Sequence, residues 1–447
     1  MFEKMFKLKE NGTNVRTEVI AGITTFFAMA YIIFVNPSIL GEAFGEGYGT
    51  ALMVATCIAA ALGTLLTAFI ANVPFAQAPG MGLNAFFTYT VCFGMGYTAQ
   101  QALAIVLISG VLFLIITVSP LRKAIIASIP APLKAAIGGG IGLFIALVGL
   151  CNADLVVASN TFDVNAAGIS LAGIPDLGAF NAGTILVIIG LILTAVLMAW
   201  KVKGALFIGI IATTIIGIPM GVTVIPETFT LSGIGDISKT FLALDFNLMT
   251  AGLLPLITAI VTFLICDMFD TVGTLIGTAG NAGMLDENGN LPRGDRALIA
   301  DGIATCTGAL LGTSTVTTFV ESSTGISEGG RTGLTSLVTG LLFLVAILLA
   351  PVAGIIPTQA TAPALIIVGV LMMKAVKNID WNDIEVAIPC FLTIAGMPFF
   401  YSIADGIGFG FITYTIIKMF RGKFKEVPVL MYILSALFIA MYVLSNI

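Results

Sequence analysis

The sequence predicts an all-α polytopic membrane protein, and three observations lead to this fold class. Of the 447 residues, 58% are hydrophobic and only 10% are charged, whereas a soluble domain carries about 25% charged residues. Apolar segments of roughly 20 residues, the length that a spanning helix needs, recur along the whole chain. The basic residues gather between alternate apolar segments, as the positive-inside rule requires. No water-soluble fold could bury so much apolar surface.

About fourteen membrane-embedded elements are predicted. The apolar spans lie near residues 17–38, 50–70, 100–118, 132–151, 182–199, 204–222, 249–278, 296–313, 332–350, 361–376, 384–400 and 405–420. Two shorter stretches, 76–93 and 315–330, are interrupted by Gly or Pro. A further apolar run, 427–447, follows the last basic cluster. The sequence leaves open whether this run spans the bilayer, lies along its surface or packs as an accessory helix.

The distribution of Lys and Arg predicts the orientation. With the N-terminus in the cytoplasm, each of the 19 Lys and Arg residues except Lys239 falls on the cytoplasmic side. Residues 1–16 are polar and lack the apolar segment of a cleaved signal peptide. We therefore expect a multi-pass protein of the plasma (inner) membrane with a cytoplasmic N-terminus. The basic clusters could also bind lipid, but topology is sufficient to explain them.

An internal repeat divides the chain into two halves. The segments ATCIAAALGTL (55–65) and ATCTGALLGTS (304–314) share a pattern of Ala, Thr, Cys, Leu and Gly, and each precedes one of the interrupted stretches. Seven elements per half would place the two segments in opposite orientations, which is typical of the inverted-topology repeat of transporters. The alternative is chance similarity between two helices rich in Ala and Gly.

Several kinds of chemistry are disfavoured by the composition. The chain has no histidine, the commonest general base and metal ligand. Its six cysteines are scattered without a CxxC pair, so we interpret them as small core residues. The Gly-rich run 138–142 lacks the Lys-Ser/Thr of a nucleotide loop and instead suits close helix packing. We expect no enzyme activity, no metal, no cofactor and no nucleic-acid partner.

Ionisable residues at membrane depth are the strongest candidates for a site, because they are costly to insert and usually face a cavity. Asp267 and Asp270 are three residues apart, on one face of a predicted helix. They follow a long apolar run, and a helix-like pattern continues after them. The alternative is that the span ends there and both carboxylates are solvated.

The interrupted stretches supply the other candidates. Glu321 lies in a segment rich in Gly and hydroxyl residues, where non-helical backbone would be tolerated only beside a cavity or buried in protein. It could bind a ligand or cap a helix. In the first stretch Asn84 offers both a donor and an acceptor, and Phe86 could stack on a flat ring or simply pack. Gly82 and Val320 complete the predicted substrate-binding set.

The inferred site holds two or three carboxylates, an amide, hydroxyls and no buried Lys or Arg. Such a site suits a neutral polar ligand with N–H donors together with a cation, and it fits an inorganic anion poorly. Two acids in a low-dielectric cavity cannot both be ionised cheaply, so one of them is expected to hold a proton. Asp267 and Glu321 are expected to face one cavity.

Three segments resemble the xanthine/uracil permease superfamily of nucleobase transporters, and most closely its AzgA-like branch of hypoxanthine/guanine/adenine permeases. They are ANVPFAQAPGMGLNAFFTYT (71–90), CDMFDTVGTLIG (266–277) and GTSTVTTFVESSTGISEGGRTGL (312–334). The resemblance covers nearly the whole chain. It implies a seven-plus-seven inverted repeat, with a core domain that moves against a gate domain. The core contains two broken elements, each with a short antiparallel strand.

The resemblance also implies a division of the chain and roles for single residues. The expected segments are a cytoplasmic N-terminus (1–16), first-half core elements (17–118), first-half gate elements (119–248), second-half core elements (249–350), second-half gate elements (351–426) and an extra C-terminal segment (427–447). Asp267 matches the substrate carboxylate of the eighth element and Glu321 that of the tenth. Asn84 matches a polar residue of the third element, and Asp270 a nearby essential acid.

We therefore expect an importer of purine bases (hypoxanthine, guanine or adenine) driven by proton symport, with an elevator or rocking motion of core against gate. A carboxylate and a backbone N–H suit a purine edge, and apolar walls suit its faces. Asp267, Asp270 and Glu321 are the expected proton-coupling acids. Sodium is the less favoured coupling ion, and a homodimer is an expectation from the resemblance. The alternative function is an anion transporter or channel on the same fold.

Overall fold

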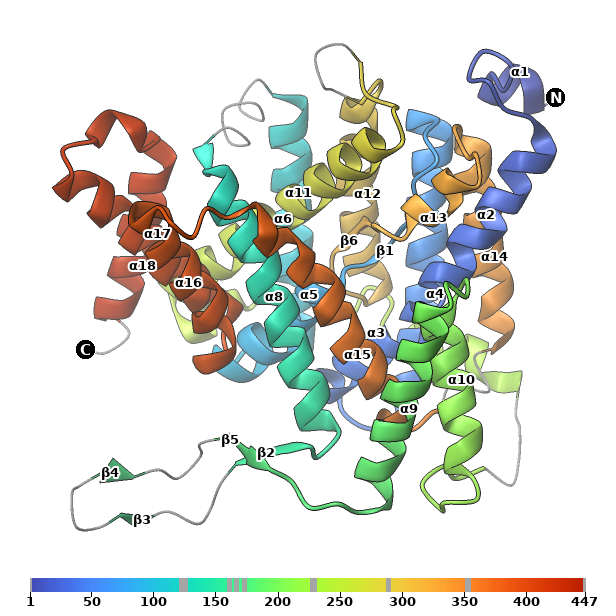
Figure 1. Cartoon of the computed structure of the whole chain (residues 1–447), viewed down its shortest axis with the longest axis horizontal. Helices are drawn as coiled ribbons and strands as arrows, with labels where there is room; N and C mark the ends of the chain where they lie inside the picture. Colours follow the sequence, from blue (N-terminus) through green and yellow to red (C-terminus); the bar gives the residue numbers. More distant parts are fainter. Residues whose placement is uncertain are drawn as a thin grey trace.

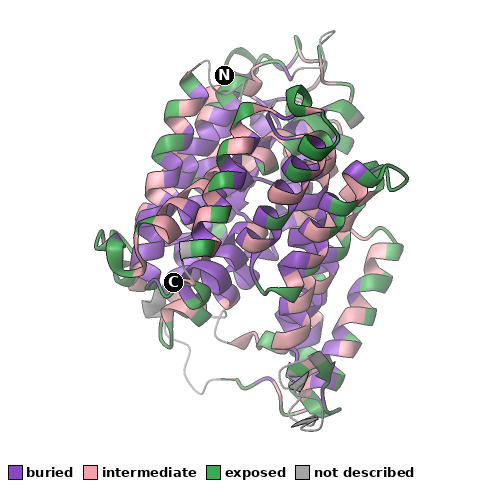
Figure 2. Cartoon of the chain, turned by 90° about the vertical axis from the view of Figure 1, so that its left-hand side faces the viewer, coloured by how far each residue is buried: buried purple, intermediate pink, exposed green. Residues whose placement is uncertain are grey.

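The computed structural model describes residues 2–119, 128–158, 163–164, 169–170, 175–225, 231–286, 291–349 and 355–444. The chain forms a bundle of helices (Figure 1), with α1 (Phe2–Phe6) at one end and the short strands β2 (Val156–Ala158) and β5 (Pro175–Leu177) at the other. Buried residues fill the centre of the bundle, while exposed residues gather at its ends and outer surface (Figure 2). The all-α membrane fold predicted from the sequence is confirmed.

The first half of the chain follows the predicted spans closely. Its helices are α2 (Val15–Met29), α3 (Ile32–Phe44), α4 (Gly49–Leu66), η1 (Thr67–Ala71), α6 (Ala99–Val118), α8 (Ala131–Asn152), α9 (Ala182–Ala199) and α10 (Ala205–Gly217). Two short 3-10 segments, η3 (Leu231–Lys239) and η4 (Leu248–Ala251), lead into the second half. Together α2 and α3 form one long apolar span, 15–44.

The second half also consists mainly of helices that match the predicted spans. Its helices are α11 (Leu253–Asn281), α12 (Gly294–Leu311), α14 (Gly333–Ala346), α15 (Thr358–Met372), η6 (Met373–Asn378), α16 (Ile384–Phe399), α17 (Ile403–Phe420), η7 (Phe424–Glu426) and α18 (Val429–Leu444). In the described part of the chain, eight helices are long and apolar enough to cross a membrane, and four more are shorter apolar helices. The chain is therefore a multi-pass membrane protein.

The two interrupted stretches meet in the middle of the bundle. The first contains β1 (Gln77–Pro79), α5 (Met81–Ala85) and η2 (Phe86–Gly94), and the second contains β6 (Val316–Thr318) and α13 (Ser322–Ser327). The strands pair antiparallel, with Gln77 opposite Thr318 and Pro79 opposite Val316. This pairing satisfies backbone groups that would otherwise be unpaired at membrane depth. Because the strands are antiparallel, α5 and α13 begin beyond opposite ends of this ladder.

Close approach of backbones sets the packing of α8 on α15 and α16. A Cβ on Gly142 would meet the Met372 Cβ at 2.6 Å and the Gly369 carbonyl oxygen at 2.8 Å, and a Cβ on Gly140 would meet the Met397 sulfur at 2.7 Å. The interpretation of run 138–142 as a packing surface is therefore confirmed at Gly140 and Gly142, where a side chain larger than hydrogen would separate these helices.

The C-terminal run forms α18, which packs against α17. The Thr415 and Ser435 hydroxyls lie 2.9 Å apart, and the rings of Phe411 and Phe438 meet edge to face. The structure describes this run to residue 444. A feature that the sequence did not predict is the extended segment between α8 and α9, where β2 pairs with β5 and β3 (Asp163–Val164) pairs with β4 (Ile169–Ser170).

Candidate functional site

A cavity of about 340 Å³ opens where the two interrupted stretches meet the helices of the predicted gate segments. Its volume falls in the range of about 300–1,000 Å³ that is usual for small-molecule sites. The residues that line it are Tyr31, Gly80, Met81, Gly82, Gly138, Asp270, Thr274, Thr317, Thr318, Phe319, Val320, Glu321, Val368, Leu371, Met372, Lys374 and Ala375. They come from all four of the predicted core and gate segments.

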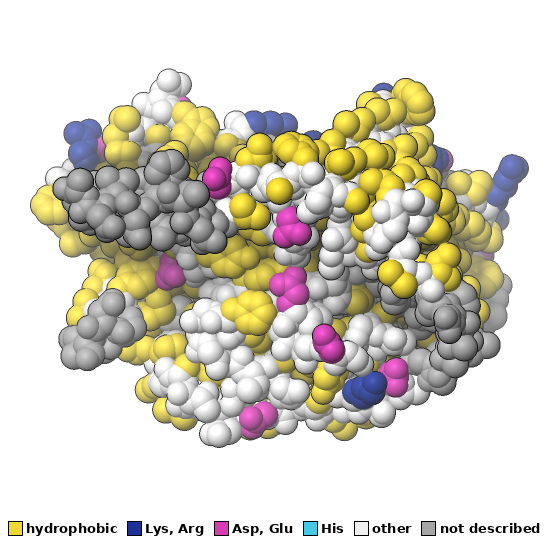
Figure 3. All heavy atoms as spheres, turned by 90° about the horizontal axis from the view of Figure 1, so that it is seen from below, with side chains coloured by type: hydrophobic (Ala, Val, Ile, Leu, Met, Phe, Trp, Pro, Cys, Tyr) yellow, Lys and Arg dark blue, Asp and Glu magenta, His cyan; other side chains and the backbone are white. Residues whose placement is uncertain are grey.

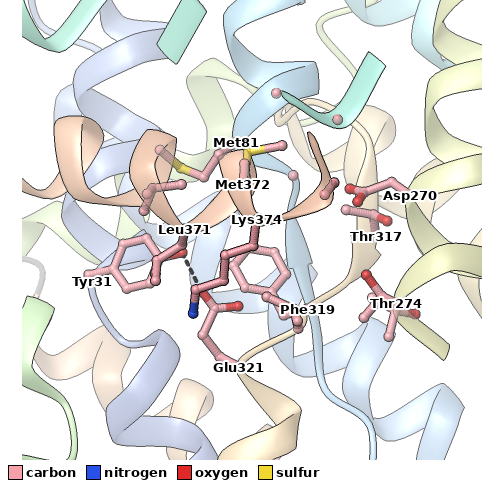
Figure 4. Close-up of a pocket in the computed structure, with 17 residues that line it drawn as sticks. Tyr31, Met81, Asp270, Thr274, Thr317, Phe319, Glu321, Leu371, Met372 and Lys374 are labelled. Carbon is pink, nitrogen blue, oxygen red and sulfur yellow. Dashed lines mark hydrogen bonds between the residues drawn. The ribbon is translucent and has the colours of Figure 1, made fainter. Parts of the chain in front are cut away.

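Glu321 lies at the break of the second interrupted stretch and lines the cavity. It immediately precedes α13 but makes no capping hydrogen bond with that helix, so the alternative interpretation as a helix cap is wrong. Its Oε1 atom accepts a hydrogen bond of 2.8 Å from the hydroxyl of Tyr31, which is buried in the span 15–44 (Figure 4). One hydroxyl thus holds the carboxylate, and no basic side chain in the described residues forms an ion pair with it.

Asp270 is the second carboxylate of the cavity. It lies near the middle of α11, a helix of 29 residues and thus about 43 Å long at 1.5 Å per residue. The helix therefore continues for 11 residues beyond Asp270. Asp270 is exposed to the cavity, and Thr274, one turn further along, lines the same wall.

Asp267 does not line the cavity, although it was expected to face it together with Glu321. Asp267 and Asp270 are offset by only about 60° around α11, but Asp267 lies on the side that packs against α12. It is 1% exposed, and its Oδ2 atom accepts a hydrogen bond of 3.0 Å from Thr305. Its Oδ1 atom has no partner within the described part of the chain. Direct contact of Asp267 with a ligand stays a prediction, and the geometry favours Asp270 for that role.

A further buried acid, Asp301 of α12, lies behind the paired strands. Its Oδ1 atom accepts hydrogen bonds from Gln77 at 3.0 Å and Thr318 at 3.3 Å, and its Oδ2 atom accepts one of 2.9 Å from Thr271. Both strands are therefore joined to α11 and α12 through this carboxylate. Asp301 was not among the predicted site residues, because it precedes the repeated segment at the start of an otherwise ordinary span.

The other predicted ligand contacts fall into two groups. Gly82 and Val320 line the cavity. Asn84 and Phe86 are fully buried and do not line it. The Phe86 ring packs edge to face on Phe263 with centroids 4.7 Å apart, and both amide atoms of Asn84 lack a partner among the described residues. The geometry thus favours the packing alternative for Phe86.

Four of the lining residues that sequence reasoning missed bear on the chemistry of the site. Phe319 supplies the aromatic wall expected of Phe86, and Tyr31 holds Glu321 from the junction of α2 and α3, 290 positions earlier in the chain. Thr274 and Lys374 also line the cavity, and Lys374 extends toward it from η6 (Figure 4). Lys374 was interpreted only as a topology signal. The expectation that no Lys or Arg belongs to the site therefore needs correction: an exposed lysine stands at its edge.

A larger cavity of about 820 Å³ adjoins the first and shares its wall at Gly82, Asp270 and Val320. It extends past Lys134 near the start of α8 and Thr278 near the end of α11. These helix ends lie at the same end of the bundle as α1 (Figure 1). The small cavity is therefore reached from that end.

Helices that can cross a bilayer, two broken elements paired in the middle of the bundle and a cavity beside them define a membrane transporter. Its chain belongs to the Permease family of xanthine/uracil type, which it matches over residues 16–407. The resemblance predicted from the sequence is confirmed.

Curated relatives of similar length support this assignment. A putative permease of Methanocaldococcus jannaschii, MJ0326, is 48% identical over 99% of this chain and 98% of its own. The adenine permease AdeP of Escherichia coli is 41% identical over 98% of this chain and 95% of its own. The guanine/hypoxanthine permease PbuG of Bacillus subtilis is 42% identical over 98% of both. The chain is therefore a transporter and not an enzyme.

A solved structure shows the same fold. The transmembrane domain of the cyanobacterial bicarbonate transporter BicA superposes with a TM-score of 0.64, covering 88% of this chain and 97% of its own. Its sequence is only 16% identical, so the similarity concerns the fold alone.

Proposed function

We propose that this permease carries purine nucleobases across the membrane. The observation that carries the proposal is Glu321, a carboxylate held by one hydroxyl in a cavity of about 340 Å³ where two broken elements meet. Such an acceptor suits the N–H donors of a purine, because charge-assisted hydrogen bonds are strong where water is scarce. The adenine and guanine/hypoxanthine permeases among the relatives support the same substrate class.

The cavity offers each group that a flat, polar ring requires. Glu321 and Asp270 accept hydrogen bonds, and Thr274 can donate or accept. Phe319, Met81 and Leu371 form apolar walls for the ring faces (Figure 4). Asp270 takes the role of second ligand acid in this proposal, in place of Asp267.

Competition for uptake tests the substrate class. Labelled hypoxanthine taken up by vesicles that contain the full chain should be displaced by hypoxanthine, guanine or adenine, and poorly by uracil, sulfate, chloride or bicarbonate. Strong displacement by an inorganic anion would favour the alternative function, an anion transporter. This alternative is tested because Lys374 places a positive charge at the edge of the cavity. The absence of purine uptake and of purine binding would refute the proposal.

Proton symport is the coupling that we propose, in preference to sodium. Four acids supply candidate proton carriers: Glu321 and Asp270 in the cavity, and Asp267 and Asp301 behind it. Asp267 has one protein donor and an unpaired oxygen in the described chain, an arrangement that suits a neutral carboxylic acid better than a buried anion. A proton gradient imposed in the absence of sodium should therefore drive purine accumulation.

We further propose that the core segments (17–118 and 249–350) move against the gate segments (119–248 and 351–426) as an elevator or by rocking. The cavity lies between the two sets, and it is reached from one end of the bundle. Thr56 and Thr305 occupy matching positions of the repeat. Thr56 accepts a hydrogen bond from Asn36 of the first element, and Thr305 donates one to Asp267 of the eighth element. The two threonines thus bind corresponding elements of the two halves, which supports the inverted repeat.

The proposed localisation is the plasma membrane, with α1 in the cytoplasm. Figure 3 views the face opposite α1, where acidic side chains are more prominent than basic ones; Arg122 and Lys123 lie outside the described residues. A cysteine between residues 286 and 295 should react only from the cytoplasm, and one near Asp163 only from outside. Reversed labelling would refute the orientation.

The homodimer stays a prediction, since an apolar outer surface can contact either lipid or a second copy of the chain.

A further inference from the structure

Lys374 stands apart from the other residues that line the small cavity. It belongs to η6, in the predicted gate, whereas Glu321 and Asp270 belong to the predicted core. Of the described residues that line this cavity, Lys374 alone carries a positive charge. Its side chain reaches toward Glu321 and Tyr31 in the close-up view (Figure 4).

The ammonium group has no protein partner in the described chain. No hydrogen bond, ion pair or ring contact joins Lys374 to another residue there. A lysine needed only for topology would serve equally well on the outer face of η6, as Lys377 does. Lys377 lies in the same short segment and lines neither cavity. The placement of Lys374 at the edge of the site therefore needs another explanation.

The two charged groups on this side of the cavity have opposite hydrogen-bonding capacities. An ionised Glu321 only accepts, and Lys374 only donates. Guanine and hypoxanthine present two adjacent acceptors, O6 and N7, and carry an N1–H donor on the other side of O6. Adenine has N7 as acceptor but an amino donor at position 6. An ammonium group that faces position 6 therefore gains from an oxo group and is opposed by an amino group.

We propose that Lys374 selects 6-oxopurines over adenine, its ammonium donating to O6 and N7 while Glu321 accepts from N1–H. The inference rests on the proposed purine substrate and deepens it. Lysine donates to the same O6/N7 pair of guanine in DNA recognition, and a good contact of this kind discriminates by roughly tenfold or more. The residue comes from the gate, so the substrate is held from both sides of the moving interface.

Equilibrium binding of three probes to the purified full-length chain tests this assignment. The probes are hypoxanthine, adenine and unsubstituted purine, which lacks any group at position 6. The unmodified chain should bind hypoxanthine roughly tenfold or more tightly than the other two. Lys374→Met should reduce this preference by weakening hypoxanthine binding, with adenine binding unchanged or improved. The preference that remains comes from Glu321, because hypoxanthine has a donor at N1 where adenine and purine have an acceptor. Lys374→Arg should keep part of the preference, since it keeps the donors and the charge.

Lys377→Met is the matched control and should bind all three probes as the unmodified chain does. Adenine binding also serves as the folding check for Lys374→Met, supplemented by the unfolding temperature. Equal weakening of hypoxanthine and adenine, an unchanged ratio, or a preference of the unmodified chain for adenine would each overturn the inference. If no purine binds the unmodified chain at all, the proposed function fails as well, so the two failures are distinguishable.

Discussion

Asp267 and Asp270 lie three residues apart, but their carboxylates differ in exposure. Asp270 is open to the cavity, whereas Asp267 is sealed between α11 and α12 with Thr305 as its donor. An acid that touches a ligand must be reachable by it, and an acid that only stores a proton need not be. We therefore separate ligand contact, by Glu321 and Asp270, from proton storage, by Asp267.

Glu321→Ala should strongly weaken purine binding. It removes the acceptor for a buried N–H, and an unsatisfied buried donor costs about 1–3 kcal/mol, equivalent to roughly 5- to 150-fold in affinity. Equilibrium binding of hypoxanthine measures this effect. Glu328→Ala is the matched control, since Glu328 lies just after α13, pairs with Lys203 at 2.7 Å and lines neither cavity. Binding by Glu321→Ala that equals binding by Glu328→Ala would contradict the assignment.

Asp267→Asn should bind purine but fail to accumulate it against a gradient. The amide keeps the shape of a protonated acid and can still accept from Thr305, but it cannot release a proton. Binding and pH-driven uptake are compared in one preparation, and exchange of internal for external purine should persist. Asp270→Asn is the comparison variant and should weaken binding itself. Uphill accumulation by Asp267→Asn would exclude Asp267 as a required proton carrier.

At the scale of elements, small residues decide how closely the predicted gate helices pack. Gly142 of α8 faces α15 so tightly that any Cβ would overlap Met372 and the Gly369 backbone. Gly138, one turn earlier, has room: a Cβ there would meet its nearest neighbour, Ala375, at 3.8 Å. Two glycines of one run therefore have different tolerances.

Gly142→Val should lower the stability of the folded chain, because overpacking of a close-packed interface typically costs about 1–3 kcal/mol. Thermal unfolding in detergent measures the change. Gly138→Ala is the control and should leave the unfolding temperature nearly unchanged, since its methyl group meets only ordinary contact. A larger loss of stability in Gly138→Ala than in Gly142→Val would show that α8 packs differently.

Hydropathy and residue spacing predicted the elements better than the contacts between them. The span 182–199 coincides with α9, and the predicted breaks contain β1 and β6, because these features depend on local composition. Tyr31 and Glu321 are 290 residues apart, and no local pattern reveals which face of one span meets another. The rotation that hides Asp267 and exposes Asp270 is likewise set by the position of α12. Lys374 was not predicted as a site residue, because the positive-inside rule already explained a lysine at this position.

At the scale of the whole molecule, the end opposite α1 is closed by contacts between predicted core and gate elements. Glu42 at the end of α3 accepts hydrogen bonds from Tyr89 at 2.8 Å and from Asn152 at the end of α8 at 2.9 Å. Ser38 and Thr361 lie 3.4 Å apart across the same interface. Exposure of the cavity to this end requires that the Glu42–Asn152 contact break, since it joins elements assigned to the two moving parts.

Glu42→Ala should therefore shift the chain toward a state that opens at the end opposite α1. The reporter is a cysteine at Val320, which lines both cavities and is 54% exposed, in a chain whose six native cysteines are replaced. A membrane-impermeant maleimide should label this cysteine from the α1 end in the parent chain. Glu42→Ala should raise its labelling rate from the opposite end several-fold, in keeping with a hydrogen bond worth about 0.5–1.5 kcal/mol.

The control variant is Glu46→Ala, which removes an exposed acid just beyond α3 and should leave the rate unchanged. Equal rates in the Glu42 and Glu46 variants would mean that the Glu42–Asn152 contact does not hold this end shut, and labelling of the parent chain from the opposite end would mean that the cavity is not closed there at all.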